Sequence, residues 1–177
     1  LGPVTALPPG RASQALGSRA MTQTVEQFVA EARAARPDLT IDRYKVRSFG
    51  GSKAVADIII PLILYGEKTG TFALGAEFDG DPARAPQVGD WYVVTWWEGP
   101  PALIYRVTDV EVVPFEDIGH EHVQVEGPNA RDVQVWRDIH WPYFGGMMQR
   151  MGREPSMQMP VIFHRYDVVH PVPPLRR

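Results

Sequence analysis

The stretch from residue 88 to residue 114 limits the possible folds of this chain more than any other. It begins with Val88-Gly89-Asp90, which is typical of a tight turn. Residues 91–98 (WYVVTWWE) follow, and they are rich in the aromatic and β-branched types that favour strands. Gly99-Pro100-Pro101 then predicts a hairpin connection to a second strand over residues 102–114. This pattern indicates antiparallel strands with short links.

Helical patterns precede this hairpin. The first helix is expected between Thr24, whose surroundings fit a capping box, and Pro37, which ends the apolar periodicity. Ser52 is suited to cap a second helix that ends at Gly66, a residue that readily adopts the left-handed conformation of a helix terminus. Pro61 lies inside this second helix and is expected to kink or divide it.

Three further elements complete the pattern. Residues 69–78 are typical of a strand, and a turn-rich stretch follows them. Residues 131–151 are expected to be helical in two parts, because Pro142 and a glycine pair interrupt them. A last strand is expected over residues 161–170. Helices, antiparallel strands, an inserted helix and a final strand together predict an α+β fold, a small and partly closed β-barrel flanked by helices.

The length of 177 residues suits one domain with its own core. Residues 1–20 contain no acidic residue and no continuous apolar run, so a flexible leader or tag is favoured over an organelle transit segment. Residues 21–47 are interpreted as an N-terminal helix and connector. The domain proper is expected over residues 48–171, with a short tail at 172–177.

Composition excludes several classes of protein. The chain contains no cysteine, which excludes disulfides, thiolate zinc sites and a cysteine nucleophile. The longest apolar run, residues 58–65, is interrupted by Pro61 and is far shorter than the roughly 20 residues of a membrane span. We therefore expect a cytoplasmic protein that has no membrane partner, and no motif predicts an organic cofactor.

The charge distribution argues against duplex nucleic acid as a partner. Residues 48–177 carry eleven lysines and arginines against seventeen aspartates and glutamates. Between Asp90 and Glu126, Arg106 is the single cation among eight carboxylates. Because binding to a duplex requires a concentrated cationic surface, only a nucleoside or a short single-stranded RNA remains a plausible nucleic-acid ligand.

Two groups of residues raise the possibility of a metal site. His120 and His122 flank Glu121, but no helical metal-binding spacing accompanies them, so solvated loop histidines are favoured. Asp79 and Asp81 belong to a DGDP sequence that a turn explains equally well. No metal site is predicted.

The segment 66–71 (GEKTGT) carries the clearest chemical signal. A lysine near a hydroxyl can activate it as a nucleophile if burial lowers the pKa of the ammonium group. Strand alternation would place Lys68 and Thr71 on opposite faces, although a helix–strand junction can change this. Taken alone, a lysine at this position is better explained by its favourable interaction with the dipole at the end of the preceding helix. Most of the five tryptophans are expected in the core, as is the pair Trp136 and His140, but one or two could form the wall of a pocket.

Six segments in order resemble the ASCH domain family: 66–71 (GEKTGT), 88–90 (VGD), 106–115 (RVTDVEVVPF), 125–127 (VEG), 136–141 (WRDIHW) and 159–162 (MPVI). The resemblance implies a PUA-like β-barrel with a cleft lined by the G-x-K-x-x-T segment. Most members of the family are inferred to bind RNA, one branch is reported as a ribonuclease, and one small branch hydrolyses acetylated cytidine.

By this resemblance, Thr71 is the nucleophile, Lys68 its activating base, and Glu126 orients the lysine or relays protons. The candidate substrate-binding residues are Gly66, Thr69, Trp97 and Arg106. If Glu126 contacts Lys68, it favours the ammonium form, which would stabilise an oxyanion; if the two are apart, a desolvated Lys68 would act as the base.

The chain departs from the family pattern at two positions. Family members often have an arginine where this chain has Ala73, which puts an anchor for phosphate or carboxylate in doubt. Gly70 is smaller than the usual residue, and we expect a looser strand there. The sequence thus predicts a possible amidohydrolase acting on acetylated cytidine-type nucleosides; a non-catalytic RNA-binding module and a ribonuclease are the alternatives.

Overall fold

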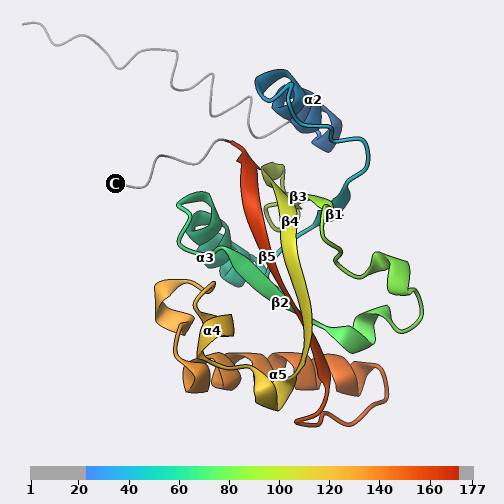
Figure 1. The fold of residues 1–177 in the computed structure, drawn as a ribbon, viewed down its shortest axis with the longest axis vertical. Coiled ribbons are helices and arrows are strands. Elements are labelled where there is room, and N and C mark those ends of the chain that lie inside the picture. Colours follow the sequence, from blue (N-terminus) through green and yellow to red (C-terminus); the bar gives the residue numbers. More distant parts are fainter. Residues whose placement is uncertain (1–22, 172–177) are drawn as a thin grey trace, which may run out of the picture.

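The computed structural model describes residues 23–171, so the predicted leader at 1–20 and tail at 172–177 lie outside the described residues. Five strands form one curled sheet in the order β1-β3-β4-β5-β2 (Figure 1). Strand β1 runs parallel to β3, and all other neighbours are antiparallel. The strands are β1 (Lys45–Arg47), β2 (Gly70–Leu74), β3 (Trp91–Thr95), β4 (Pro101–Pro114) and β5 (Pro160–His170).

Helices cover this sheet at its ends and along its side (Figure 1). They are α2 (Val25–Ala35), α3 (Lys53–Leu64), α4 (His120–Val123) and α5 (Val133–Arg150), with short 3-10 turns at Gly75–Phe78, Pro82–Arg84, Phe115–Asp117 and Pro128–Ala130. Figure 1 shows α2 at one end of the sheet and α5 across the other. The predicted α+β half-barrel flanked by helices is therefore present.

The predicted helix starts are confirmed. Thr24 and Gln27 form a reciprocal capping box at the start of α2, and the Ser52 hydroxyl accepts the Val55 N–H at the start of α3. The predicted division of these helices is wrong: α3 continues through Pro61, and α5 continues through Pro142. A proline removes a single hydrogen bond from the helix, and buried apolar side chains before and after each proline hold the helix together.

Two predicted strands are shorter than expected. Strand β2 ends at Leu74, opposite Val161, because β5 starts at Pro160 and offers no partner to the residues after Leu74. Strand β3 ends at Thr95, where the hairpin turn to β4 begins. Trp97 therefore lies in a turn and not in a strand.

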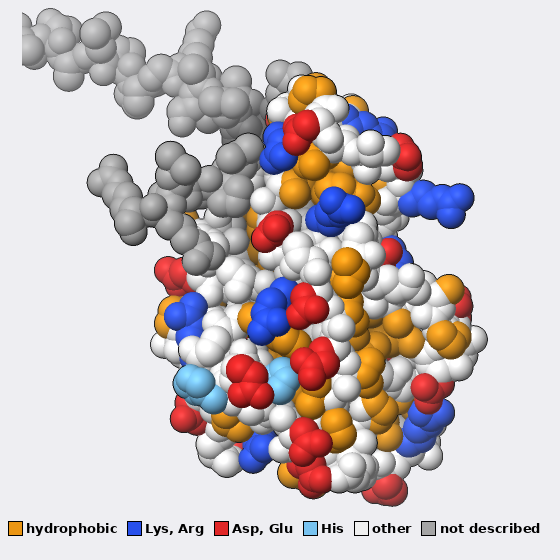
Figure 2. Space-filling view, in the orientation of Figure 1, with side chains coloured by type: hydrophobic (Ala, Val, Ile, Leu, Met, Phe, Trp, Pro, Cys, Tyr) orange, Lys and Arg blue, Asp and Glu red, His pale blue; other side chains and the backbone are white. Residues whose placement is uncertain are grey.

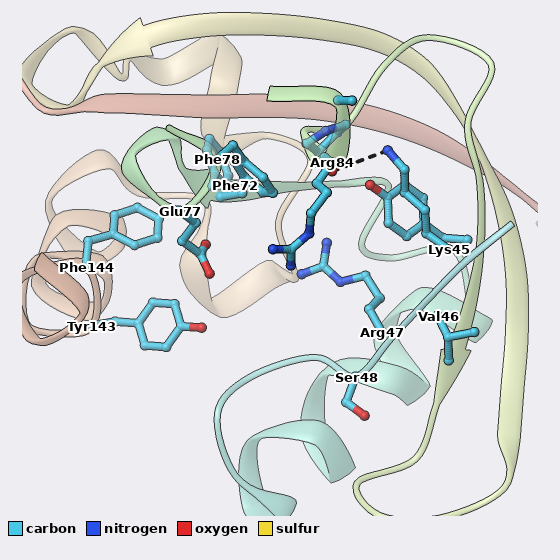
Figure 3. A pocket seen from close by; sticks show the side chains of 14 residues that line it. Lys45, Val46, Arg47, Ser48, Phe72, Glu77, Phe78, Arg84, Tyr143 and Phe144 are labelled. Atoms are coloured by element: carbon cyan, nitrogen blue, oxygen red, sulfur yellow. Dashed lines mark hydrogen bonds between the residues drawn. The ribbon is translucent and has the colours of Figure 1, made fainter. Parts of the chain in front are cut away.

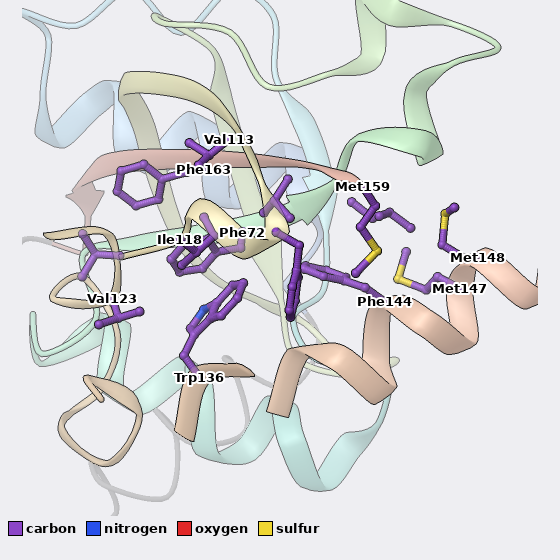
Figure 4. Close-up of a cluster of buried hydrophobic side chains, with 14 residues drawn as sticks. Phe72, Val113, Ile118, Val123, Trp136, Phe144, Met147, Met148, Met159 and Phe163 are labelled. Atoms are coloured by element: carbon purple, nitrogen blue, oxygen red, sulfur yellow. The ribbon is translucent and has the colours of Figure 1, made fainter. Parts of the chain in front are cut away.

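The core has three parts that fix the helices on the sheet. The largest fills the space between the sheet and α5 and centres on the fully buried Trp136 (Figure 4). A second joins α3 to the sheet through Ile60, Ile63 and Tyr105. The third lies under α2. Because α3 and α5 are anchored independently, the space between them has firm walls.

Strand β2 packs closely at Gly70, contrary to the expectation of a looser strand. A Cβ atom there would lie 2.8 Å from the His164 carbonyl oxygen and 2.8 Å from a Val125 methyl group. Both distances are too short for a carbon atom, so a side chain at this position would push β2 away from β5 or from the 125–127 segment. Glycine lets the three segments meet.

Candidate functional site

A cavity of about 730 Å³ lies along the open side of the half-barrel, where the edge strands β1 and β2 do not pair with each other. Its walls come from the segment after β1, from α3, from the start of β2, from residues 126–130 and from α5. Lys68, Thr71 and Glu126 all line it. Lys68 and Thr71, which are three residues apart, thus share one hollow with Glu126, which is distant from them in the sequence.

The end of α3 positions Lys68. Gly66 has a φ of 70°, and the N–H groups of Gly66 and Glu67 bond back to the carbonyls of Ile63 and Leu62 at 2.9 and 2.8 Å. The Lys68 N–H also donates to Leu62, at 3.0 Å. The expected strand alternation therefore does not apply to Lys68, because this residue still belongs to the helix terminus when β2 begins at Gly70.

Backbone and arginine contacts hold Glu126 next to this terminus. The N–H of Thr69 donates to the Val125 carbonyl at 2.8 Å. Arg131 bridges the two segments, since its Nε donates to the Glu126 carbonyl at 2.8 Å and its Nη2 to the Glu67 carbonyl at 2.7 Å. Sequence analysis missed Arg131, and nothing in the sequence distinguishes it from a surface arginine. Its role depends on two segments that meet only in the folded chain.

Lys68 and Glu126 form a buried ion pair. The Lys68 ammonium donates to Glu126 Oε2, and the two residues are only 3% and 7% exposed. Burial lowers the pKa of Lys68, and the Glu126 charge works against this effect without cancelling it. The two conditions that sequence analysis treated as alternatives, contact with a carboxylate and desolvation, therefore occur together. The result is a buried ion pair whose lysine loses its proton more readily than an exposed lysine does.

Thr71 and His140 complete the polar lining near this pair. Thr71 is 6% exposed and lies opposite His164 in the β2–β5 ladder. His140 stacks on Trp136 with ring centroids 4.2 Å apart, and its Nδ1 lies 2.9 Å from the Trp136 carbonyl, which can only accept a hydrogen bond. Burial lowers the pKa of His140 to about 4. The ring is therefore neutral at pH 7, and its Nε2 is an acceptor.

The candidate substrate-binding residues do not line this cavity. Gly66 forms the terminus of α3, and the backbone of Thr69 bonds to Val125 and Tyr166. Trp97 packs against the core beside α3. Arg106 is exposed on β4, with its guanidinium 5.3 Å from the centre of the Trp91 ring.

The histidines at 120 and 122 and the aspartates at 79 and 81, which were considered as metal ligands, do not form a metal site. No group of three or more histidine, aspartate or glutamate side chains in residues 23–171 has the arrangement of a metal site. Asp79 pairs with Arg153. His122 is buried, not solvated as expected: its Nδ1 accepts the Gly119 N–H at 3.0 Å, and its ring packs edge-on against Phe163. Within the same residues, no helix has the length and hydropathy of a membrane span.

Comparison with known proteins establishes the family. A family model described as the ASCH domain matches residues 45–170. The chain belongs to the ASCH domain family. The match includes β1, which starts at Lys45 and pairs with β3, so it begins slightly before the domain start expected at residue 48. No curated protein matches the chain.

Two solved structures share the fold of this ASCH domain. The ASCH domain from Lactobacillus crispatus JV V101 is 23% identical, with a TM-score of 0.72 over 85% of this chain and 98% of that one. Protein EF3133 from Enterococcus faecalis V583 is 22% identical, with a TM-score of 0.73 over 84% of this chain and 94% of that one. The predicted α+β, PUA-like architecture is thereby confirmed.

The buried His164 and the half-buried His140 predict a loss of stability in acid. The ring nitrogens of His164 have no hydrogen-bond partner among the described residues. Burial lowers the pKa of His164 to about 3 and the pKa of His140 to about 4. The ordinary value is 6.5, so between pH 6.5 and these values the unfolded chain binds protons that the folded chain does not. The free energy of unfolding should fall over this range, by about 4 kcal/mol for His164.

Urea titrations at pH 6.5, 5 and 4 measure this effect. Acidic residues also contribute to acid sensitivity, so the comparison is with His164→Phe, which removes the titrating ring but keeps an aromatic side chain. This variant should lose less stability between pH 6.5 and 4 than the parent, and His120→Phe, at an exposed histidine, should behave like the parent. Equal slopes for the parent and His164→Phe would contradict the prediction.

Proposed function

We propose that the cavity of this ASCH domain hydrolyses an acyl amide on a nucleobase, with acetylated cytidine as the representative substrate. The observation that supports this is the convergence of Lys68, Thr71 and Glu126 on one largely buried cavity, with the lysine and the carboxylate in direct contact. A hydroxyl beside a pair that can accept and return a proton is the basic requirement for acyl transfer.

The reaction follows from the properties of the pair. Because burial lowers the pKa of Lys68, its neutral amine is accessible, and this is the form that acts as the base. Thr71 Oγ1 attacks the acetyl carbonyl carbon, and the hydroxyl proton moves to Lys68 Nζ. The ammonium so formed stabilises the oxyanion of the tetrahedral intermediate. The C–N bond then breaks, the exocyclic nitrogen of cytosine takes the proton from Lys68, and an acetyl ester remains on Thr71. Water hydrolyses this ester, which releases acetate and restores the hydroxyl.

The size and lining of the cavity suit a nucleoside. A volume of about 730 Å³ lies within the roughly 300–1,000 Å³ typical of small-molecule sites. Phe49, Phe72 and Tyr143 provide aromatic surface for a flat base. On the face shown in Figure 2, acidic and basic side chains are interspersed among the coloured residues and do not form a continuous cationic surface. This distribution favours a small ligand over a long RNA.

The direct test is turnover of N4-acetylcytidine, followed by chromatography. We expect cytidine and acetate to appear in equal amounts, at a rate proportional to protein concentration. The two alternatives are tested on the same preparation with a short single-stranded RNA. Its binding, titrated at two salt concentrations, tests the RNA-binding module, and its degradation, measured on the recovered RNA, tests the ribonuclease. Absence of any deacetylation, with the protein shown to be folded, would overturn the proposal.

A further inference from the structure

A second hollow, which we call the seam groove, continues the cavity along the open side of the half-barrel (Figure 3). It has a volume of about 470 Å³ and lies between the edge strands β1 and β2 and the two 3-10 turns that follow β2. Arg47, Phe72 and Tyr143 line both hollows. The two hollows are therefore adjacent.

Two arginines point into the seam groove and take part in no ion pair among the described residues. In Figure 3 the guanidinium ends of Arg47 and Arg84 are directed toward the middle of the groove. Neither forms an ion pair with any residue between 23 and 171. The Arg47 guanidinium lies 4.5 Å from the centre of the Phe49 ring, and this stacking holds its orientation. Two like charges that face one hollow repel each other unless an anion lies between them.

The third cation of the groove has a different role. Lys45 Nζ donates to the Arg84 carbonyl oxygen at 3.3 Å (Figure 3). It also donates to Asp90 Oδ2 at 2.7 Å and to the Ala85 carbonyl oxygen at 3.0 Å. Its charge is balanced by Asp90, and its remaining bonds tie the turn that carries Arg84 to strand β1. These bonds fix the backbone of the turn that carries Arg84 opposite strand β1, while the Arg84 side chain itself is exposed.

One carboxylate also faces the groove. Glu77 is directed toward the two arginines in Figure 3 but makes no ion pair with either of them. Burial raises the pKa of Glu77, and Arg47 and Arg84 only partly oppose this effect. The carboxylate is therefore a weaker counter-charge to the two arginines than an exposed glutamate would be. The two planar guanidinium groups of the groove suit the oxygens of a phosphate group.

We propose that Arg47 and Arg84 bind a phosphate group of the ligand whose base occupies the cavity. This deepens the proposed function, on which it rests for the identity of the base: the substrate is an acylated nucleotide and not a free nucleoside. Ala73 also lines the groove, and its small side chain leaves the space open. The anchor that the resemblance placed in doubt at position 73 is supplied here by side chains from β1 and from the turn at Pro82–Arg84.

Calorimetric titration tests the phosphate site without requiring catalysis. Cytidine, cytidine 5′-monophosphate, cytidine 3′-monophosphate and the dinucleoside phosphate CpC are the probes. The parent protein should bind at least one monophosphate or CpC about tenfold or more tightly than cytidine. Tighter binding of a monophosphate would show that the phosphate belongs to a free nucleotide. Tighter binding of CpC would show that it belongs to a single-stranded RNA. Equal affinity for cytidine and all three phosphorylated probes would overturn the proposal.

Two matched arginine variants test whether the preference for phosphorylated probes depends on Arg84. Arg84→Gln should abolish the preference for the phosphorylated probe and leave the affinity for cytidine unchanged. Arg43→Gln, at an exposed arginine outside both hollows, should behave like the parent. A preference that Arg84→Gln and Arg43→Gln reduce equally would refute the assignment.

The binding titration and the hydrolysis assay can fail separately. A phosphate preference without deacetylation would refute the hydrolytic function and leave the phosphate site standing. Deacetylation of N4-acetylcytidine and its 5′- and 3′-monophosphates with equal kcat/KM, unaffected by Arg84→Gln, would refute the phosphate site and leave the hydrolytic function standing.

Discussion

Replacing Thr71 with valine should lower kcat/KM for deacetylation of N4-acetylcytidine by at least about 1,000-fold, because the change removes the only atom proposed to attack the substrate. Valine keeps the shape of threonine and suits a strand, and Thr71 makes no side-chain hydrogen bond with any described residue. The fold and the affinity for cytidine should therefore be preserved. Initial rates, together with calorimetric binding of cytidine, measure the two quantities separately.

The control for this experiment is Thr108→Val, on the exposed side of β4 and outside both hollows. Its activity should equal that of the parent. A Thr71→Val protein that retains more than about a tenth of the parent rate would show that another group attacks the carbonyl, and the assignment of Thr71 as nucleophile would have to be abandoned.

Replacing Glu126 with leucine should destabilise the domain by about 3–5 kcal/mol, because it leaves the buried Lys68 ammonium without a counter-charge. The loss should depend on pH in a defined direction. Burial lowers the pKa of Lys68 even with Glu126 in place, and loss of that carboxylate should lower it further. The unfolded variant should therefore bind more protons than the folded one. The destabilisation should therefore shrink as the pH rises from 7 to 9.

The double variant Lys68→Met with Glu126→Leu distinguishes a lost ion pair from a packing defect. It removes both charges while keeping side chains of similar size, so its stability should return to within about 1 kcal/mol of the parent while activity stays absent. Glu154→Leu, at an exposed glutamate without an ion pair, should have little effect on stability. A double variant as unstable as Glu126→Leu alone would contradict this account of the pair.

Local signals in the sequence predicted the local features of the fold. The capping box at Thr24, the cap at Ser52 and the left-handed Gly66 were all predicted correctly, because each depends on residues within one or two turns of the chain. The hairpin between β3 and β4 was predicted for the same reason. The limits of the strands were not, since a strand ends where its partner ends, and this is settled by residues far away in the sequence.

The chemistry at Lys68, Thr71 and Glu126 came from a resemblance between motifs, and only the folded chain could bring these residues to one cavity. The composition and local patterns of the sequence determined which helices and strands form and which residue types are present. Tertiary structure decided that Lys68 meets Glu126, that Arg131 bridges their segments, and that Arg47 and Arg84 face one groove. These contacts join residues up to 64 positions apart, and their strength comes from burial and from charges brought close together, neither of which exists before the chain has folded.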